Sequence, residues 1–163
     1  MVNQKVLSTQ LKRLGCKVYV AGHGLEALKF LKTTQLWHGG TADTIDVTTG
    51  AIDITTSSEA TVDVILMDIE MPVMGGLACT RAIRELEGRG SIRLPQLQQQ
   101  SCRERHHGRL PIISISANAR VEQSDEQREA GVDDVVIKPF RIPQLMDKIW
   151  RLIGREMPNA GHS

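Results

Sequence analysis

The chain has 163 residues, of which 40% are apolar, and this is enough for one domain with a substantial core. Its 20 basic residues nearly balance 19 acidic ones, so no strong net charge favours a nucleic acid or an anionic membrane as partner. No apolar run approaches the roughly 20 residues of a membrane-spanning helix, and the N-terminus lacks the apolar centre of a signal peptide. Three cysteines at unrelated spacings, Cys16, Cys79 and Cys102, favour free thiols in a reducing cytoplasm over disulfides.

The first part of the chain predicts two helices and a strand. Apolar residues at helical spacing predict an amphipathic helix over 2–14. Alternating apolar residues then predict a strand over 16–21. A turn containing His23 leads into a second helix over 25–32, and a histidine in such a turn is more often structural than a ligand.

Two segments interrupt this pattern and are expected to be insertions in the domain. Residues 33–61 are rich in Thr and Ser, and a near-repeat around a Thr-Gly pair is compatible with either a β-hairpin or a loop. Residues 87–109 contain a glutamine run and scattered arginines, which indicate an exposed insertion. Its His106 and His107 lie near Cys102, but adjacent histidines point in different directions and no fourth zinc ligand has suitable spacing.

Three further apolar runs are typical of buried strands in a parallel sheet, and each ends in a different polar group. The runs and their last residues are 62–68 with Asp68, 110–116 with Ser116, and 134–138 with Lys138. Because the carboxyl ends of parallel strands meet at one edge, we expect a carboxylate, a hydroxyl and an ammonium to face one phosphate-sized space. An aspartate that accepts a phosphoryl group needs such a hydroxyl donor and cation to bind the new oxygens.

Each of these strands is followed by a predicted helix. Cys79, Ile83 and Leu86 mark the inner face of the first, and 121–130 forms a polar second helix. The last, over 142–153, has the clearest apolar stripe in the chain and is expected to dock on the sheet. The domain is therefore expected to span 1–153, followed by a tail, 154–163, that should fray.

Three motifs in this order resemble the receiver domain of two-component phosphorelays, most closely the receiver at the end of fungal hybrid histidine kinases. They are DVILMDIEMPVMGG, PIISISANA and AGVDDVVIKPF, and the resemblance covers 1–32, 62–86 and 110–153. The resemblance implies Asp68 as phosphoacceptor, Ser116 as switch hydroxyl and Lys138 as phosphate-binding lysine. It implies Mg²⁺ as cofactor, held by Asp68 and the backbone carbonyl of Glu70. It also implies a histidine kinase or a histidine-containing phosphotransfer protein as the partner that donates the phosphoryl group.

The resemblance implies a three-layer, flavodoxin-like α/β fold in which helices cover both faces of a parallel sheet. The family has five strands in the order 2-1-3-4-5, and four are predicted here, at 16–21, 62–68, 110–116 and 134–138. The absent strand is the first, which in the family ends in an acidic pair that binds Mg²⁺. We therefore expect a sheet truncated to four strands, exposed strand edges and weakened Mg²⁺ binding. The chain is interpreted as a truncated gene model or a piece of a longer hybrid kinase.

Two other functions stay open. The missing acidic pair favours a degenerate receiver that cannot be phosphorylated and acts as a binding module. A phosphatase of the haloacid-dehalogenase type also uses an aspartate at a strand end, with a second acid two residues on as general acid. Here that position is Glu70, and Met71-Pro72 follows it in place of a threonine-bearing turn. The favoured interpretation is a signalling module that is not an enzyme.

Overall fold

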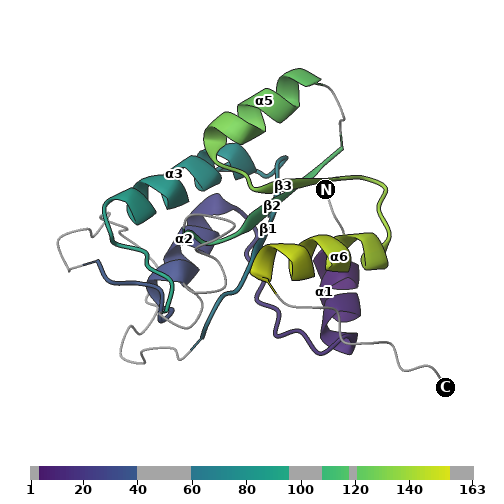
Figure 1. The fold of residues 1–163 in the computed structure, drawn as a ribbon, viewed down its shortest axis with the longest axis horizontal. Helices are drawn as coiled ribbons and strands as arrows, with labels where there is room; N and C mark the ends of the chain where they lie inside the picture. Colours follow the sequence, from purple (N-terminus) through teal and green to yellow (C-terminus); the bar gives the residue numbers. More distant parts are fainter. Residues whose placement is uncertain (1–3, 40–59, 96–107, 118–120, 155–163) are drawn as a thin grey trace.

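The structure, a computed structural model, describes residues 4–39, 60–95, 108–117 and 121–154. Within them a parallel sheet lies between two layers of helices, which confirms the predicted flavodoxin-like architecture (Figure 1). The possible hairpin within 33–61, the cluster of Cys102 with His106 and His107, and the tail from 155 onward lie outside the described residues. No helix in the described ranges is long and apolar enough to cross a bilayer.

All of the predicted helices are found, and three of the predicted strands are found with shorter bounds. In chain order, the elements of the described residues are α1 (Gln4–Arg13), α2 (Gly24–Lys32), β1 (Ile65–Asp68), α3 (Gly76–Gly88), β2 (Ile112–Ser116), α5 (Val121–Ala130), β3 (Asp134–Ile137) and α6 (Ile142–Ile153).

The three strands form one parallel sheet in the order β1-β2-β3. Asp68 of β1 is opposite Ile115 of β2, and Ser116 of β2 is opposite Ile137 of β3. The last residues of the strands are therefore in nearly the same register. This register brings all three carboxyl ends to one edge of the sheet.

The prediction of a strand over 16–21 is wrong. No strand is assigned there, and the sheet of the described residues has three strands where four were predicted. An extended segment becomes a strand only when a neighbour accepts and donates its backbone hydrogen bonds, and the strand expected between this segment and β1 is not among the described ones. Tyr19 and Val20 are consequently 49% and 57% exposed, although Val18 still packs on the core.

Two apolar clusters hold the layers together, one on each face of the sheet. Residues of α2 and α3 pack with Met67 and Ile112 on one face. Residues of α1 and α6 pack with Ile113 and Val136 on the other, where Figure 1 shows α1 next to α6. Successive strand residues alternate between the faces, so these short strands supply both clusters. The predicted stripe of α6 is confirmed, since its buried residues are Leu145, Met146, Ile149 and Leu152.

The ends of the two interrupting segments are packed into the core and contact each other. Trp37 and Ile92 form an antiparallel bridge. The backbone N–H of Arg93 donates to the carbonyl of Leu36 at 2.9 Å, and that of His38 donates to the carbonyl of Ser91 at 2.7 Å. The expectation of an exposed segment is therefore wrong around Ile92, which is buried. Single apolar residues among polar ones gave no periodic signal for this packing.

Candidate functional site

Asp68 and Lys138 form an ion pair at the carboxyl edge of the sheet. Nζ of Lys138 lies 3.2 Å from Oδ2 of Asp68, and the two side chains are 20% and 12% exposed. Asp68 ends β1 and Lys138 follows β3, so the pair reaches across the end of β2. The ammonium of Lys138 offsets the charge of the Asp68 carboxylate. It would also attract a second anionic group bound next to that carboxylate.

Ser116 ends the strand between these two residues. It is buried, and its carbonyl accepts the backbone N–H of Lys138 at 2.8 Å. The structure therefore brings Asp68, Ser116 and Lys138 to adjacent strand ends, and it does not scatter them over separate surfaces. The chemical role of each residue stays a prediction.

The turn after β1 fixes the carboxylate of Asp68. The backbone N–H of Glu70 donates to Oδ1 of Asp68 at 3.1 Å, an arrangement that aspartate favours in turns. Oδ2 faces Lys138, so each carboxylate oxygen has a donor. Farther along the turn, exposed Val73 has a positive φ of 65°.

Gly76 lets α3 begin directly beside Asp68. Its N–H donates to the carbonyl of Ile69 at 3.1 Å, and a Cβ at this position would lie 2.2 Å from the carbonyl oxygen of Asp68. That distance is far inside van der Waals contact with backbone that cannot rotate away. The closeness of the two backbones has no local sequence signal.

The carboxylate of Asp68 and the backbone carbonyl of Glu70 are the ligands predicted for a divalent cation. Both ligands come from one short turn. No group of three or more His, Cys, Asp or Glu side chains that could hold a metal ion occurs in the part of the chain that the structure describes. Because Mg²⁺ takes about six oxygens, these two donors would leave most of its coordination to water.

His23 caps α2 and has the structural role that the sequence favoured. Its Nδ1 accepts the backbone N–H of Glu26 at 3.4 Å. Next to it, the N–H of Gly24 donates to the carbonyl of Met74 at 3.1 Å. The start of α2 is thereby joined to the turn that follows Asp68.

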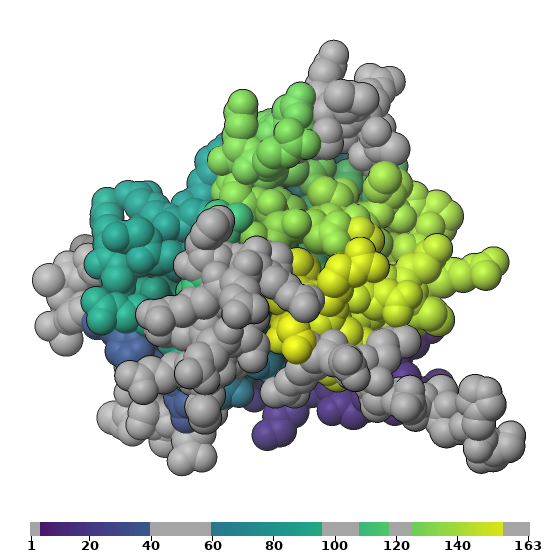
Figure 2. Space-filling view, viewed as in Figure 1, coloured from purple at the N-terminus to yellow at the C-terminus, as the bar shows by residue number. Residues whose placement is uncertain are grey.

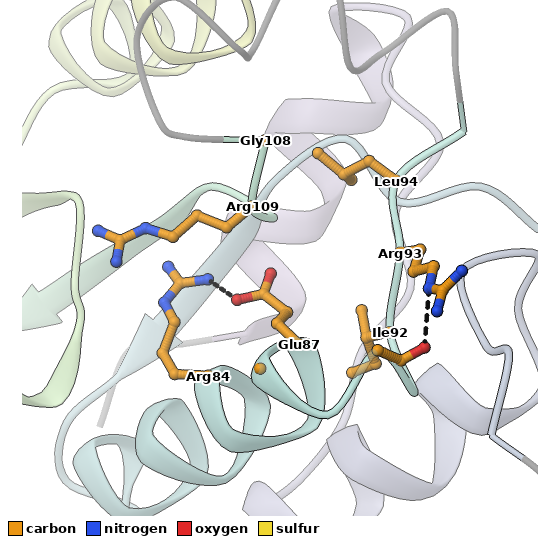
Figure 3. A pocket seen from close by; sticks show the side chains of 9 residues that line it. Arg84, Glu87, Ile92, Arg93, Leu94, Gly108 and Arg109 are labelled. Carbon is orange, nitrogen blue, oxygen red and sulfur yellow. Dashed lines mark hydrogen bonds and ion pairs between the residues drawn. The ribbon is translucent and has the colours of Figure 1, made fainter.

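The opposite end of the sheet carries a buried ionic network that the sequence did not predict. Asp133, just before β3, is paired at 2.8 Å with both Arg84 and Arg109, and its side chain is only 1% exposed. Arg84 also contacts Glu87 at 2.8 Å (Figure 3). A cavity of about 400 Å³ lies beside these residues, and its wall continues through Ile92, Arg93 and Leu94.

Comparison with known proteins gives several relatives of one kind, although the chain matches no protein-family model. It is 29% identical over 148 residues to hybrid signal transduction histidine kinase I of Dictyostelium discoideum. These residues cover 91% of this chain and 6% of that protein. It is 25% identical over 159 residues to sensor histidine kinase GacS of Pseudomonas protegens, covering 98% of this chain and 13% of that protein. The chain therefore spans only a small part of the curated relatives it matches.

The similar solved structures include receiver domains and response regulators. The receiver domain of sensor histidine kinase PA1611 from Pseudomonas aeruginosa, solved with a magnesium ion coordinated in its active-site cleft, has a TM-score of 0.60 and 27% identity. That comparison covers 94% of this chain and 89% of the other. The Vibrio cholerae chemotaxis protein CheY4 shares the fold with a TM-score of 0.58 and 22% identity, covering 91% and 88% of the two chains.

Proposed function

We propose that this chain, a response-regulator receiver domain, accepts a phosphoryl group on Asp68 within a phosphorelay. The single observation that carries the proposal is the ion pair of Asp68 with Lys138 at 3.2 Å, next to the end of the strand that carries Ser116. The donor is a phosphohistidine of a histidine kinase or of a histidine-containing phosphotransfer protein. The phosphorus–nitrogen bond breaks as a carboxylate oxygen of Asp68 bonds to phosphorus, and the electron pair of the broken bond returns to the imidazole.

Each of the three residues has a distinct task in this reaction. Asp68 is the nucleophile, and the Glu70 N–H holds its carboxylate in one orientation. The ammonium of Lys138 stabilises the negative charge that arrives with the phosphoryl group. The hydroxyl of Ser116 donates to one of the new phosphoryl oxygens and so reports phosphorylation to β2.

Binding of Mg²⁺ is part of the proposal, with lower affinity than a full set of carboxylates would give. When bound, the cation offsets charge between the phosphoryl group and the carboxylate. The carboxylate of Asp68 and the carbonyl of Glu70 would hold it, with water completing its coordination. A titration with Mg²⁺, followed by amide chemical shifts near these two residues, measures the affinity directly.

The test is the variant Asp68→Asn, which keeps the shape of the side chain but removes the nucleophile. We expect radiolabelled phosphoryl transfer from a histidine-containing phosphotransfer protein to the chain, and its loss in Asp68→Asn. The matched control is Asp147→Asn on the exposed face of α6, which should be labelled like the unmodified chain. Labelling of Asp68→Asn at the original rate would overturn the proposal.

The alternatives are not favoured. A degenerate receiver need not keep a carboxylate and an ammonium in contact at the sheet edge, as Asp68 and Lys138 are. Beryllofluoride, which imitates a phosphoryl group on aspartate, separates the cases: amide chemical shifts that stay unchanged with beryllofluoride and Mg²⁺ would indicate a binding module. Turnover of a generic phosphomonoester that disappears in Asp68→Asn would instead indicate a phosphatase.

A further inference from the structure

The second half of α5 has little apolar contact with the sheet. Of its residues from Asp125 onward, only Gln127 and Ala130 are buried, each 2% exposed. Glu126 lies 3.7 Å from Arg81 of α3, but both side chains are about half exposed, so this ion pair contributes little. Figure 2 shows α5 as a green surface near the top of the molecule. Hydrophobic burial therefore holds this half of the helix weakly.

The buried contact between α5 and the sheet is polar. The hydroxyl of Ser114, in the middle of β2, donates to Oε1 of Gln127 at 2.5 Å, and both residues are buried. If either partner were lost, the other would be left as an unsatisfied polar group away from water. A hydrogen bond is also directional, so this pair fixes the position of α5 more narrowly than an apolar contact would.

The same face of β2 carries Ser116. Side chains of a strand alternate between faces, so Ser114 and Ser116 lie on the face where Ile112 packs against α2 and α3. Ser116 precedes α5 closely in the chain. The strand that carries the proposed switch hydroxyl is thus also the strand that holds α5.

We propose that the hydrogen bond between Ser114 and Gln127 is a latch that holds α5 against the sheet. The latch limits how far α5 shifts when Ser116 turns toward a phosphoryl group on Asp68. The coupling to Ser116 rests on the proposed function, whereas the latch itself does not. It makes Gln127 and Ser114 positioning residues, since they act through the position of α5.

Hydrogen exchange of the α5 amides tests the latch without any phosphoryl chemistry. We expect Ser114→Ala to speed this exchange about tenfold, because Gln127 then keeps a buried carbonyl without its donor. The double variant Ser114→Ala/Gln127→Met should restore slow exchange, because both groups are then apolar. Glu129→Ala, on the exposed face of α5, is the matched control and should leave exchange unchanged. Unchanged exchange in Ser114→Ala, or equal acceleration in β2, α3 and α6, would overturn the latch.

Adding beryllofluoride with Mg²⁺ tests the coupling between Ser116 and α5. The double variant can be used for this test even if Ser114→Ala fails to fold. We expect beryllofluoride to change α5 exchange at least about twofold more in the double variant than in the unmodified chain, because the directional contact is gone. Equal changes would overturn the coupling. If beryllofluoride changed no amide chemical shift around Asp68 in any variant, both the proposed function and the coupling would be overturned. The latch would still be decided by the hydrogen-exchange rates of α5 measured without beryllofluoride.

Discussion

Cys79 is a residue whose burial has a consequence for pH. It lies fully buried on the inner face of α3, and desolvation raises the pKa of its thiol from 9.0 to about 11. Burial also raises the pKa of Cys16, which is only half-buried. A thiol that ionises less readily in the folded chain than in the unfolded chain keeps its proton on folding, so folding is favoured while the thiol is neutral.

The free energy of unfolding should therefore fall with pH in a defined window. The contribution of Cys79 is fully present below about pH 9 and is lost as the pH rises toward about 11, because the folded-state pKa lies above the unfolded one. Urea unfolding at a series of alkaline pH values measures this loss. A Cys79→Val variant has no thiol to ionise and should lose less stability over the same range. Identical pH dependence in the two chains would contradict the assignment to Cys79.

At the scale of elements, the position of α3 depends on Gly76, which has no Cβ and so lets the helix begin against the backbone of Asp68. We expect Gly76→Ala to cost about 2 kcal/mol, because its Cβ would press on the carbonyl of Asp68, and the resulting shift should also weaken beryllofluoride binding. Gly88→Ala is the matched control in the same helix. Nothing lies within 4 Å of its added Cβ, so it should be neutral or stabilise the chain by about 0.5 kcal/mol.

Chemical unfolding and beryllofluoride titration of both variants measure these effects. If Gly76→Ala were as stable as Gly88→Ala and bound beryllofluoride equally well, the close approach of α3 to Asp68 would not constrain the site.

The sequence predicted the helices because their pattern is local. The apolar stripe of α6 and the inner face of α3 follow from spacing within one helix, and both are found in the structure. The placement of Asp68, Ser116 and Lys138 at adjacent strand ends was predictable because each ends an apolar run, while their chemical roles stay predictions. The strand over 16–21 was not a safe prediction, because alternation shows which residues suit a strand but cannot show that a neighbour is present to bond it. The buried contact between Ser114 and Gln127 was not predictable either, because polar residues are usually expected to be exposed to solvent.

At the scale of the whole molecule, the two ends of the sheet differ in how far their charged side chains are exposed. The carboxyl ends of the strands hold Asp68 and Lys138, whose side chains are partly exposed and form the proposed phosphoryl site. At the amino ends, Asp133 ties α3 to the starts of β2 and β3: it pairs with Arg84 and accepts the backbone N–H of Ile112 at 2.8 Å. Such a network forms between residues far apart in the chain, so no local pattern predicted it.

Asp133→Asn should therefore destabilise the whole domain and leave the affinity of the folded chain for beryllofluoride unchanged. The amide of Asn has no negative charge to offset the charges of Arg84 and Arg109, and its NH2 group faces one of them, which should cost about 3 kcal/mol. Asp125→Asn is the matched control, because its pair with Arg128 is largely exposed and should contribute less than about 0.5 kcal/mol. Urea unfolding measures the free energy of unfolding. Titration with beryllofluoride, at urea concentrations well below the unfolding midpoint, measures the affinity of the folded chain. A stable Asp133→Asn chain would show that the network does not hold the sheet together, and a stable chain with weakened binding would show that the two ends are coupled.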